Sequence, residues 1–400
     1  MNEGLIKIKE ETQRCLNCKN RPCSDKGCPL NNDIPEFIKL VKEENYKEAY
    51  NILTKTTVLP SICGRICPHD KQCQGSCIRG IKGTAVNIGE IEAFVGDMAI
   101  KNNYEIYKFE KQDLKGKNVA IVGGGPAGIT ASAFFARRGA NVTIYERYDF
   151  LGGLLIYGIP EFRLSKELVK KSISKILELG IDVKYNKELG KNLNLEELEK
   201  NYDNIVLAFG ANVSIKLGVP GENLKGVFGA NELLEYNLHP NYMGKTVIVN
   251  GGGNVALDVA RTVKKLGAKK VIIIYRRQME QMPAEKKEIE CAINEKIEFL
   301  FQHNIVKIIG DNNDIARKVE VIKTELIQKD GEKRLFPIDI KGSNYEINAD
   351  YIITAIGSHI DNFARKLDLS NPKISVIGDL AEKNKTVAWA AKSGRDIALK

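Results

Sequence analysis

The sequence has only four histidines, a single cysteine after residue 77 and no long apolar run. The histidines form no helical pair, which excludes the paired-histidine zinc site of a metal hydrolase. No apolar run reaches the ~18 residues that a membrane-spanning helix needs, so we expect no membrane partner. The late cysteine, Cys291, lies alone on a helix-like stretch and is expected to be structural.

Charged side chains are spread evenly along this 400-residue chain. The 60 Lys and Arg exceed the 51 Asp and Glu by nine, but no dense basic block with interleaved aromatic residues is present. A nucleic-acid partner is therefore not expected. The apolar share of 43% and the charged share of 28% are ordinary for a globular protein, and the length suggests two to three domains.

The other eight cysteines stand in two blocks near the amino terminus. The first block has the spacing C-x2-C-x4-C-x4-C-P and the second C-x3-C-x5-C-x3-C, with Pro68 after its second cysteine. Eight thiolates are the number needed to hold two 4Fe-4S clusters, and a proline after a ligand cysteine recurs in ferredoxin-type runs. The candidate ligands are Cys15, Cys18, Cys23, Cys28, Cys63, Cys67, Cys73 and Cys77.

Three other uses of these cysteines compete with the clusters. A disulfide framework suits a short secreted domain, whereas this chain is long and shows no apolar leader after Met1. Structural zinc usually takes regular C-x2-C pairs, which are absent here. Buried inert cysteines would be scattered rather than clustered. Reduced thiolates favour a cytoplasmic setting.

Helical patterns fill residues 30–110. Asp33 and Glu36 form a capping-box pattern, and Ile88, Ile91 and Val95 share one face of a later helix. Glu92 interrupts that apolar face. Its carboxylate either reaches solvent beside the apolar stripe or completes an iron-sulfur cluster, and spacing alone leaves both alternatives open.

From Lys117 onward the pattern changes to short β-branched runs separated by glycines, which indicates an α/β fold. The first run leads into Gly123-Gly124-Gly125-Pro126-Ala127-Gly128, a helix, a second strand and then Glu146. This is the dinucleotide-binding fingerprint in its full context, where the acidic residue bonds to ribose hydroxyls. We expect FAD at this fingerprint.

A second fingerprint begins at Gly251 and includes Gly253, Asn254 and Val255. Its second strand ends in Arg276-Arg277 instead of an acid, and a guanidinium pair suits a 2′-phosphate. The site is therefore expected to bind NADP(H). The alternative is an NAD site with two solvated arginines beside it.

The order of these motifs indicates a helical iron-sulfur domain followed by two Rossmann-like domains, one of them inserted into the other. The expected boundaries are 1–115 for the two 4Fe-4S clusters, 116–242 for the first part of the FAD domain, 243–350 for the NADP(H) domain and 351–400 for the second part of the FAD domain.

The chain resembles the small (beta) subunit of NADPH-dependent glutamate synthase over nearly its whole length. The same module occurs in the large subunit of the Nfn-type ferredoxin:NADP oxidoreductase, in sulfide dehydrogenase and in the amino-terminal half of dihydropyrimidine dehydrogenase. Besides the cysteine blocks and fingerprints, the resemblance rests on Gly152 to Pro160, Leu207 to Ala211, Tyr275-Arg276-Arg277 and Gly378-Asp379.

This resemblance implies crosswise cluster ligation. One cluster would take Cys15, Cys18, Cys23 and Cys77, and the other Cys28, Cys67 and Cys73 with either Glu92 or Cys63 as its fourth ligand. It also implies a flavin pocket shaped by Gly152 to Pro160, with Gly378-Asp379 and Thr386-Val387 near the flavin. Further expected cofactor-binding residues are Arg147, Gly153, Leu154, Arg163, Gly210 and Gly357.

The expected activity depends on the three cofactors together. NADPH gives up a hydride, clusters take single electrons, and a flavin works in both modes, so the cofactors carry the catalysis and no catalytic side chain is assigned. The electron-accepting partner would be a glutamate synthase large subunit or a ferredoxin-linked subunit. A non-catalytic scaffold is the further alternative. A thioredoxin-reductase-like activity is disfavoured because Cys291 has no C-x-x-C partner.

One departure from the resemblance concerns the carboxyl terminus. The chain stops at Lys400, inside what we expect to be the last helix of the flavin domain.

Overall fold

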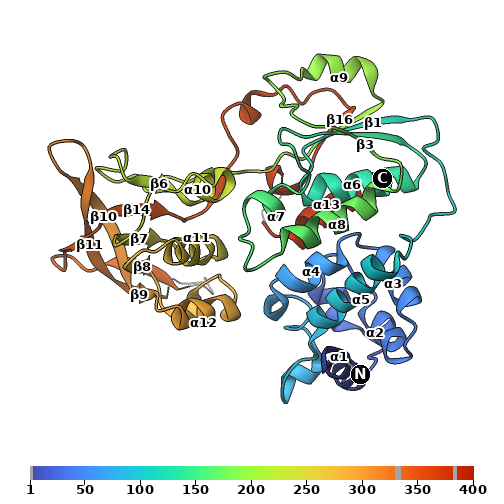
Figure 1. Ribbon diagram of the computed structural model, residues 1–400, viewed down its shortest axis with the longest axis horizontal. Helices are drawn as coiled ribbons and strands as arrows, with labels where there is room; N and C mark the ends of the chain where they lie inside the picture. The colour runs from blue at the N-terminus through green and yellow to red at the C-terminus, as the bar shows by residue number, and fades with distance from the viewer. Residues whose placement is uncertain (1–2, 329–334, 382–384) are drawn as a thin grey trace. The chain divides into compact units, whose positions relative to one another are not determined.

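The computed structural model describes residues 3–328, 335–381 and 385–400. The chain forms two compact units, drawn in Figure 1. The first unit contains 1–156, 161–210 and 362–400, and the second contains 157–160 and 211–361. None of the helices in the described ranges has the length and apolar character to cross a bilayer.

The amino-terminal part of the first unit is helical, as predicted. Its central helix is α5 (Ile88–Asn102), which contacts the four helices before it. The predicted apolar face is confirmed, because Ile88, Ile91 and Val95 are all buried. The other helices are α1 (Glu3–Gln13), α2 (Ile34–Lys42), α3 (Tyr46–Thr54) and α4 (Pro60–Ile66).

The predicted capping box at the start of α2 is wrong. Asp33 stands at the cap position, but its side chain accepts no hydrogen bond from the helix. Its carboxylate instead pairs with Arg21, at 3.0 Å. The Asp33 carboxylate therefore forms an ion pair with Arg21 of the preceding loop and does not accept a hydrogen bond from the first backbone amides of α2.

Glycines bring the backbones of α4 and α5 unusually close together. A Cβ on Gly64 would lie 2.4 Å from the amide nitrogen of Ala93, and one on Gly96 would lie 2.4 Å from the amide nitrogen of Ser61. Real Cβ atoms do not approach other atoms so closely. The two helices can cross at this distance only because no side chain stands at these positions.

The flavin-type part of the first unit is built on a parallel sheet with the order β16-β4-β1-β2-β3. All four neighbouring pairs are parallel. Helix α6 packs on this sheet next to β1 and β2, and α13 packs closely against α6, since a Cβ on Gly394 of α13 would lie 2.2 Å from the carbonyl oxygen of Ala127 in α6. The elements are β1 (Asn118–Val122), α6 (Pro126–Arg137), β2 (Asn141–Tyr145), α7 (Leu154–Tyr157), α8 (Lys166–Leu177), β3 (Asp182–Lys184), α9 (Leu195–Asn201), β4 (Asn204–Leu207), β16 (Ile374–Val376) and α13 (Val387–Ala398).

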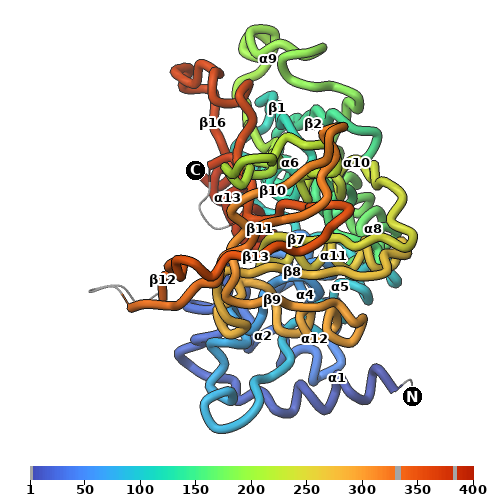
Figure 2. The backbone as a smooth tube through the Cα atoms, turned by 90° about the vertical axis from the view of Figure 1, so that its left-hand side faces the viewer, coloured from blue at the N-terminus to red at the C-terminus, as the bar shows by residue number. Residues whose placement is uncertain are grey.

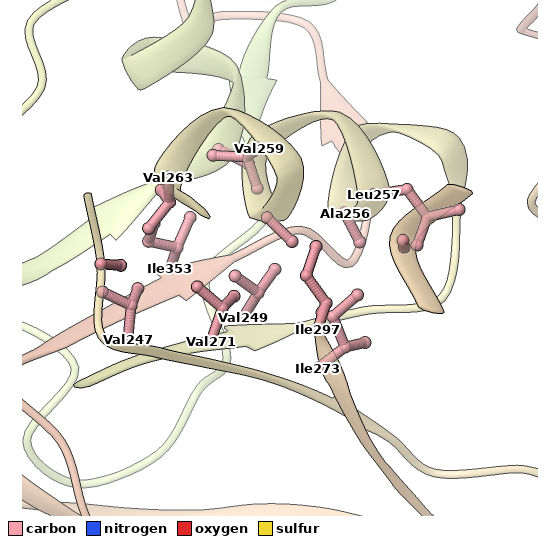
Figure 3. Close-up of a cluster of buried hydrophobic side chains, with 14 of the residues drawn as sticks. Val247, Val249, Ala256, Leu257, Val259, Val263, Val271, Ile273, Ile297 and Ile353 are labelled. Atoms are coloured by element: carbon pink, nitrogen blue, oxygen red, sulfur yellow. The ribbon is translucent and has the colours of Figure 1, made fainter. Parts of the chain in front are cut away.

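The second unit holds another five-stranded parallel sheet, ordered β6-β14-β7-β8-β9. Helix α11 (Asn254–Lys265) covers one face of it, and Figure 3 shows Val259 and Val263 of the helix above Val247, Val249 and Ile353 of the strands. The other elements around this sheet are β6 (Val227–Gly229), α10 (Ala230–Tyr236), β7 (Thr246–Asn250), β8 (Lys270–Tyr275), α12 (Lys286–Asn294), β9 (Glu298–Phe301) and β14 (Tyr351–Thr354).

Antiparallel strands complete the second unit. Strand β11 pairs with β10, β12 and β13, and the long β10–β11 pair can be followed in Figure 2. A separate two-stranded ribbon joins β5 to β15. These strands are β5 (Val213–Ser214), β10 (His303–Gly310), β11 (Ala316–Ile327), β12 (Phe336–Asp339), β13 (Tyr345–Asn348) and β15 (Ser358–His359).

The division of the chain differs from the expected boundaries at both ends of the inserted part. The second unit takes over at Ala211, not at residue 243, and the first resumes at Asn362, not at residue 351. Strand β14, expected in the flavin domain, pairs with β7 and β6 of the second sheet. A run of β-branched residues fits any buried parallel strand, so its sequence does not indicate which sheet receives it.

An arginine ties the segment after α5 to helix α6. The Arg137 guanidinium carbon lies 3.9 Å from the centroid of the Phe109 ring and 4.6 Å from that of Phe134. The side chain is buried, and none of its three nitrogens has a hydrogen-bond partner among the described residues. Burial lowers the pKa of Arg137 to about 10. Aromatic faces therefore stabilise this cation where carboxylates ordinarily would.

The close crossing of α4 and α5 predicts that Gly64→Ala is destabilising. Its methyl group has no space, and overpacking of this kind costs about 1–3 kcal/mol. We expect a melting temperature several degrees lower and a reduced iron content in the purified protein. Gly83→Ala is the matched control, because the nearest atom to a Cβ at that position is 3.8 Å away. Equal melting temperatures for the two variants would contradict the crossing.

Candidate cofactor sites

The first set of cysteines surrounds a cavity in the helical part. Cys15, Cys18, Cys23 and Cys77 all line it, and all four are half-buried. Burial raises the pKa of Cys23 to about 11, and the Cys77 charge adds to this effect. The rest of the lining is largely apolar and includes Ile34, Ile38, Val86 and Ile88. These are the four cysteines that crosswise ligation assigns to one cluster.

The second set lies deeper and gathers around a carboxylate. Cys67 and Cys73 are buried, and Cys28 is half-buried. Burial raises the pKa of Cys28 to about 12, with the Glu92 charge as the next cause. The same two causes raise the pKa of Cys73. The Glu92 charge contributes to the raised pKa of all three thiols, which indicates that Cys28, Cys67 and Cys73 are its neighbours.

Glu92 does not reach solvent. Only 6% of the residue is exposed, and burial raises the pKa of its carboxyl group to about 8. Asn32 Nδ2 donates to Glu92 Oε1 at 3.3 Å, and the Thr56 hydroxyl donates to Asn32 Oδ1 at 2.7 Å. The solvent-exposed alternative for Glu92 is therefore wrong. Sequence reasoning missed Asn32, which precedes α2 in no recognisable motif.

Cys63 lies beside the second set, and its thiol forms a hydrogen bond with the thiol of Cys67. A hydrogen bond between Cys63 and Cys67 is the largest cause that raises the pKa of Cys67, ahead of burial. The Cys63 carbonyl also lies 3.1 Å from His69 Nε2. Cys63 is thus close enough to remain a candidate ligand beside Glu92.

The first set of cysteines lines a cavity in a way that fits an iron-sulfur cluster. No three His, Cys, Asp or Glu side chains in the described parts of the chain converge closely enough to hold one metal ion. A cubane of four irons and four sulfides holds its ligands around a much larger body, and four thiols around an apolar cavity have that arrangement.

The first fingerprint forms the loop between β1 and α6. Gly123 has a φ of +103°, which favours glycine, and a Cβ on Gly128 would lie 1.9 Å from the Gly123 carbonyl oxygen. At the end of β2, Glu146 returns to this loop. Its carboxylate accepts hydrogen bonds from the amides of Gly124, at 2.7 Å, and Tyr148, at 3.0 Å.

Two glycines leave the space in front of this loop open. Gly125 precedes Pro126 and Ala127 at the start of α6, and a Cβ on Gly153 would lie 2.9 Å from the Gly125 Cα atom. Side chains at either position would fill the space that a pyrophosphate needs at the helix amino terminus. The loop therefore fits a dinucleotide such as FAD.

The carboxyl-terminal part of the first unit joins the same helix. A Cβ on Gly378 would lie 2.8 Å from the Ala127 Cβ atom, and the Gly378 amide donates to Ser393 of α13 at 2.9 Å. Thr386 caps α13, since its hydroxyl accepts from the Trp389 amide at 3.4 Å. The first unit thus holds the following candidate flavin residues: Gly123 to Gly128, Glu146, Arg147, Gly153, Leu154, Arg163, Gly210, Gly378, Asp379, Thr386 and Val387.

The second fingerprint lies between β7 and α11 in the second unit. The side chain of Asn254, at the start of α11, makes two hydrogen bonds with Glu285. Its Nδ2 donates to the Glu285 carboxylate at 3.1 Å, and its Oδ1 accepts from the Glu285 backbone amide at 2.9 Å. Glu285 was not predicted, because nothing in the sequence links it to a glycine loop about 30 residues earlier. The second unit holds Gly251, Gly253, Asn254, Val255, Arg276, Arg277 and Gly357.

The two arginines after β8 differ in their exposure to solvent. Arg277 is buried, and its Nε donates to the Leu335 carbonyl at 3.2 Å. Arg276 is exposed, and no ion pair to its guanidinium occurs among the described residues. Arg276 therefore has the side chain that is available to a ligand, while Arg277 already has a structural contact.

Two family models match the chain. One, described as a dihydropyrimidine dehydrogenase domain II with a 4Fe-4S cluster, matches residues 3–104, and one described as a pyridine nucleotide-disulphide oxidoreductase matches residues 117–394. The second match covers well over half of the chain. The chain belongs to the pyridine nucleotide-disulphide oxidoreductase family.

Relatives of this oxidoreductase include a member of the family that its motifs resemble. The glutamate synthase [NADPH] small chain of Escherichia coli is 33% identical over 99% of this chain and 91% of its own length. The NADPH-Fe(3+) oxidoreductase subunit beta of Geobacter sulfurreducens is 35% identical over 89% of this chain and 53% of its own length.

A solved structure shares the fold of this oxidoreductase. FprA from Mycobacterium tuberculosis in complex with NADPH has a TM-score of 0.62 and 20% identity, and the match covers 70% of this chain and 83% of FprA. The protein is thus a flavin- and NAD(P)H-dependent oxidoreductase with an iron-sulfur domain, and the predicted family and fold class are confirmed.

Substitution of Glu92 and of Cys63 separates the two candidate ligands of the second cluster. If Glu92 is the ligand, we expect Glu92→Ala to lose about four of eight irons per chain and Cys63→Ala to retain all eight. Iron analysis and electron paramagnetic resonance of the reduced protein measure this. The reverse pattern would assign the site to Cys63, and full iron in both single variants would contradict either assignment.

Proposed function

We propose that this oxidoreductase takes a hydride from NADPH and delivers single electrons to a partner protein, as a glutamate synthase small subunit or a close relative. The observation that carries this proposal is the coexistence of two glycine fingerprints with two sets of cluster ligands in one chain. When bound, the flavin supplies the change from two-electron to one-electron transfer.

The chain's own residues hold and position the cofactors in this proposal. Glu146, fixed by two backbone amides, faces the ribose side of the first loop and helps to hold FAD. Cys15, Cys18, Cys23 and Cys77 hold one cluster. Cys28, Cys67 and Cys73 hold the other, with Glu92 as fourth ligand and Cys63 as the alternative.

Glu92 is the stronger candidate for that fourth position because of its burial. A carboxylate is costly to bury without a positive partner, and iron supplies that charge. The Asn32 amide then orients one carboxylate oxygen, as hydrogen bonds from surrounding groups orient other metal ligands.

The partner is an electron-accepting subunit in our proposal. A relative called a small chain and another called subunit beta both belong, by name, to larger assemblies. A glutamate synthase large subunit and a ferredoxin-linked subunit are both consistent with this. The unpaired state of the cysteines supports a reducing, cytoplasmic location.

Anaerobic reduction tests the activity directly. The purified protein is expected to contain about eight irons and one FAD, and NADPH is expected to bleach the flavin absorbance near its visible maximum. Stopped-flow spectroscopy measures the bleaching, with dithionite as the positive control for a reducible flavin. A flavin that dithionite bleaches and NADPH does not would reject the proposed activity and favour a non-catalytic scaffold.

Arg276 is expected to set the preference for NADPH. A charge-assisted hydrogen bond contributes about 1.5–3 kcal/mol, so Arg276→Ala should weaken NADPH binding by roughly tenfold or more. NADH binding should change less than about twofold, because NADH lacks the 2′-phosphate. Titration of the oxidised protein with unreactive analogues of NADPH and of NADH measures the two dissociation constants.

Arg277→Ala is the matched comparison for this experiment. Its side chain is buried against the Leu335 carbonyl, so we expect a lower melting temperature and a smaller effect on nucleotide preference. An unchanged NADPH preference in Arg276→Ala and in the double variant would show that no 2′-phosphate binds here.

A further inference from the structure

The two sets of cluster ligands differ in their access to the surface. Cys15, Cys18, Cys23 and Cys77 line a cavity and are all half-buried, whereas in the other set Cys67, Cys73 and Glu92 are buried and Cys28 alone is half-buried. Electron transfer weakens steeply with distance, so a carrier outside the protein exchanges electrons best with the set nearest the surface. The mouth of this cavity is therefore the place to examine for a docking surface.

Two large apolar side chains, one in the cavity lining and one that follows the lining residues in sequence, are exposed to solvent. Leu16, which lines the cavity between two of the cysteines, is 54% exposed. Ile81 follows the cavity-lining residues Ile78 and Arg79 and is 76% exposed. It is the most exposed of the large apolar residues in the described parts of the chain. A protein that docks here would bury these two side chains, and the loss of their contact with water would stabilise the complex.

The charge around the same mouth is positive. Lys19, Lys26 and Lys82 are exposed, each lies within three residues of a cavity-lining residue, and none forms an ion pair with any described residue. Arg79 lines the cavity itself, and its Nε donates to the Arg14 carbonyl, which leaves the positive charge uncompensated.

The acidic side chains nearby do not cancel this charge. Asp25 pairs with Arg21 at 3.3 Å, and Arg21 pairs in turn with Asp33 at 3.0 Å. Glu11 pairs with Arg14 at 2.7 Å. Arg21 faces two carboxylates, so this group keeps one uncompensated negative charge, but the four basic side chains of the mouth outnumber it and leave a net positive field.

We propose that this cavity mouth is the docking surface for an acidic one-electron carrier protein. The surface is defined as Leu16, Lys19, Lys26, Arg79, Ile81 and Lys82, and the proposal rests on the function proposed above. A cluster held by Cys15, Cys18, Cys23 and Cys77 would be oxidised by one electron as the docked carrier is reduced by one electron, with no transfer of an atom or a proton. The basic side chains steer the carrier, and the two apolar side chains hold it in contact.

The proposal is tested by binding, with the loaded enzyme and an oxidised acidic plant-type ferredoxin as the probe. The test variant is the double charge reversal Lys19→Glu and Lys82→Glu. We expect its dissociation constant, measured by calorimetry at low salt, to be at least about tenfold weaker than that of the wild type. Wild-type binding should weaken further as salt rises and screens the charges.

A second double reversal, Lys101→Glu and Lys200→Glu, controls for net charge. Both lysines are exposed and form no ion pair with a described residue, and Lys101 lies ~20 Å along α5 from the cavity-lining Ile88. This variant should bind ferredoxin within about twofold of the wild type. Equal weakening in both double variants would show only a net-charge effect and would overturn the proposal.

Basic cytochrome c, which is also a one-electron carrier, serves as a second probe with a charge opposite to that of ferredoxin. It should bind the Lys19→Glu and Lys82→Glu variant more tightly than it binds the wild type. Ile81→Ser should weaken ferredoxin binding without altering its salt dependence. Wild-type protein that binds no ferredoxin, or that forms a dimer which the reversal dissociates, would overturn the proposal and, in the second case, assign the surface to a second copy of the chain.

Failure of this surface is distinguishable from failure of the proposed function. Binding of oxidised ferredoxin needs no NADPH, and photoreduced enzyme mixed with ferredoxin reports electron transfer without the nucleotide. Loss of bleaching by NADPH would therefore reject the proposed activity alone. Normal bleaching with no difference between the reversed and control variants would reject the docking surface alone.

Discussion

The close crossing of α4 and α5 is the constraint on which the cluster region depends. Cys63 and Cys67 belong to the α4 end of this contact, and Glu92 lies on α5 next to Ala93, the residue that Gly64 touches. A larger residue at Gly64 would separate the helices and withdraw Glu92 from the thiols. The glycines thus serve the metal site indirectly, through the distance between two backbones.

The two glycine fingerprints suit different ligands because the side chains at the ends of their second strands differ. In the first unit Glu146 turns back to the loop, and its carboxylate accepts a hydrogen bond from the Gly124 amide, which fixes the carboxylate beside the loop. In the second unit Arg276 extends into solvent from the end of β8. The two sites differ in the charge and exposure of the side chain at the end of the second strand, Glu146 in one and Arg276 in the other, while the strands and helices around them are alike.

The sequence was sufficient for the motifs and insufficient for the three-dimensional neighbours. Both fingerprints, the helical face of Ile88, Ile91 and Val95 and the family were predictable, because each depends on local spacing. The sheet that receives β14, the pairing of Asp33 with Arg21 and the burial of Glu92 were not. These depend on which distant segments fold together, and a period of two or 3.6 residues carries no such information.

The aromatic stack around Arg137 has a consequence for how the protein tolerates its solvent. Surface ion pairs weaken as ionic strength rises, but a buried guanidinium held by ring faces has little contact with dissolved ions. The contact between the segment after α5 and helix α6 should therefore not weaken at high salt concentration. A wash with concentrated salt would then remove proteins bound through surface charges, while the cysteine-rich helical part stays packed against the first nucleotide-binding part of the same unit.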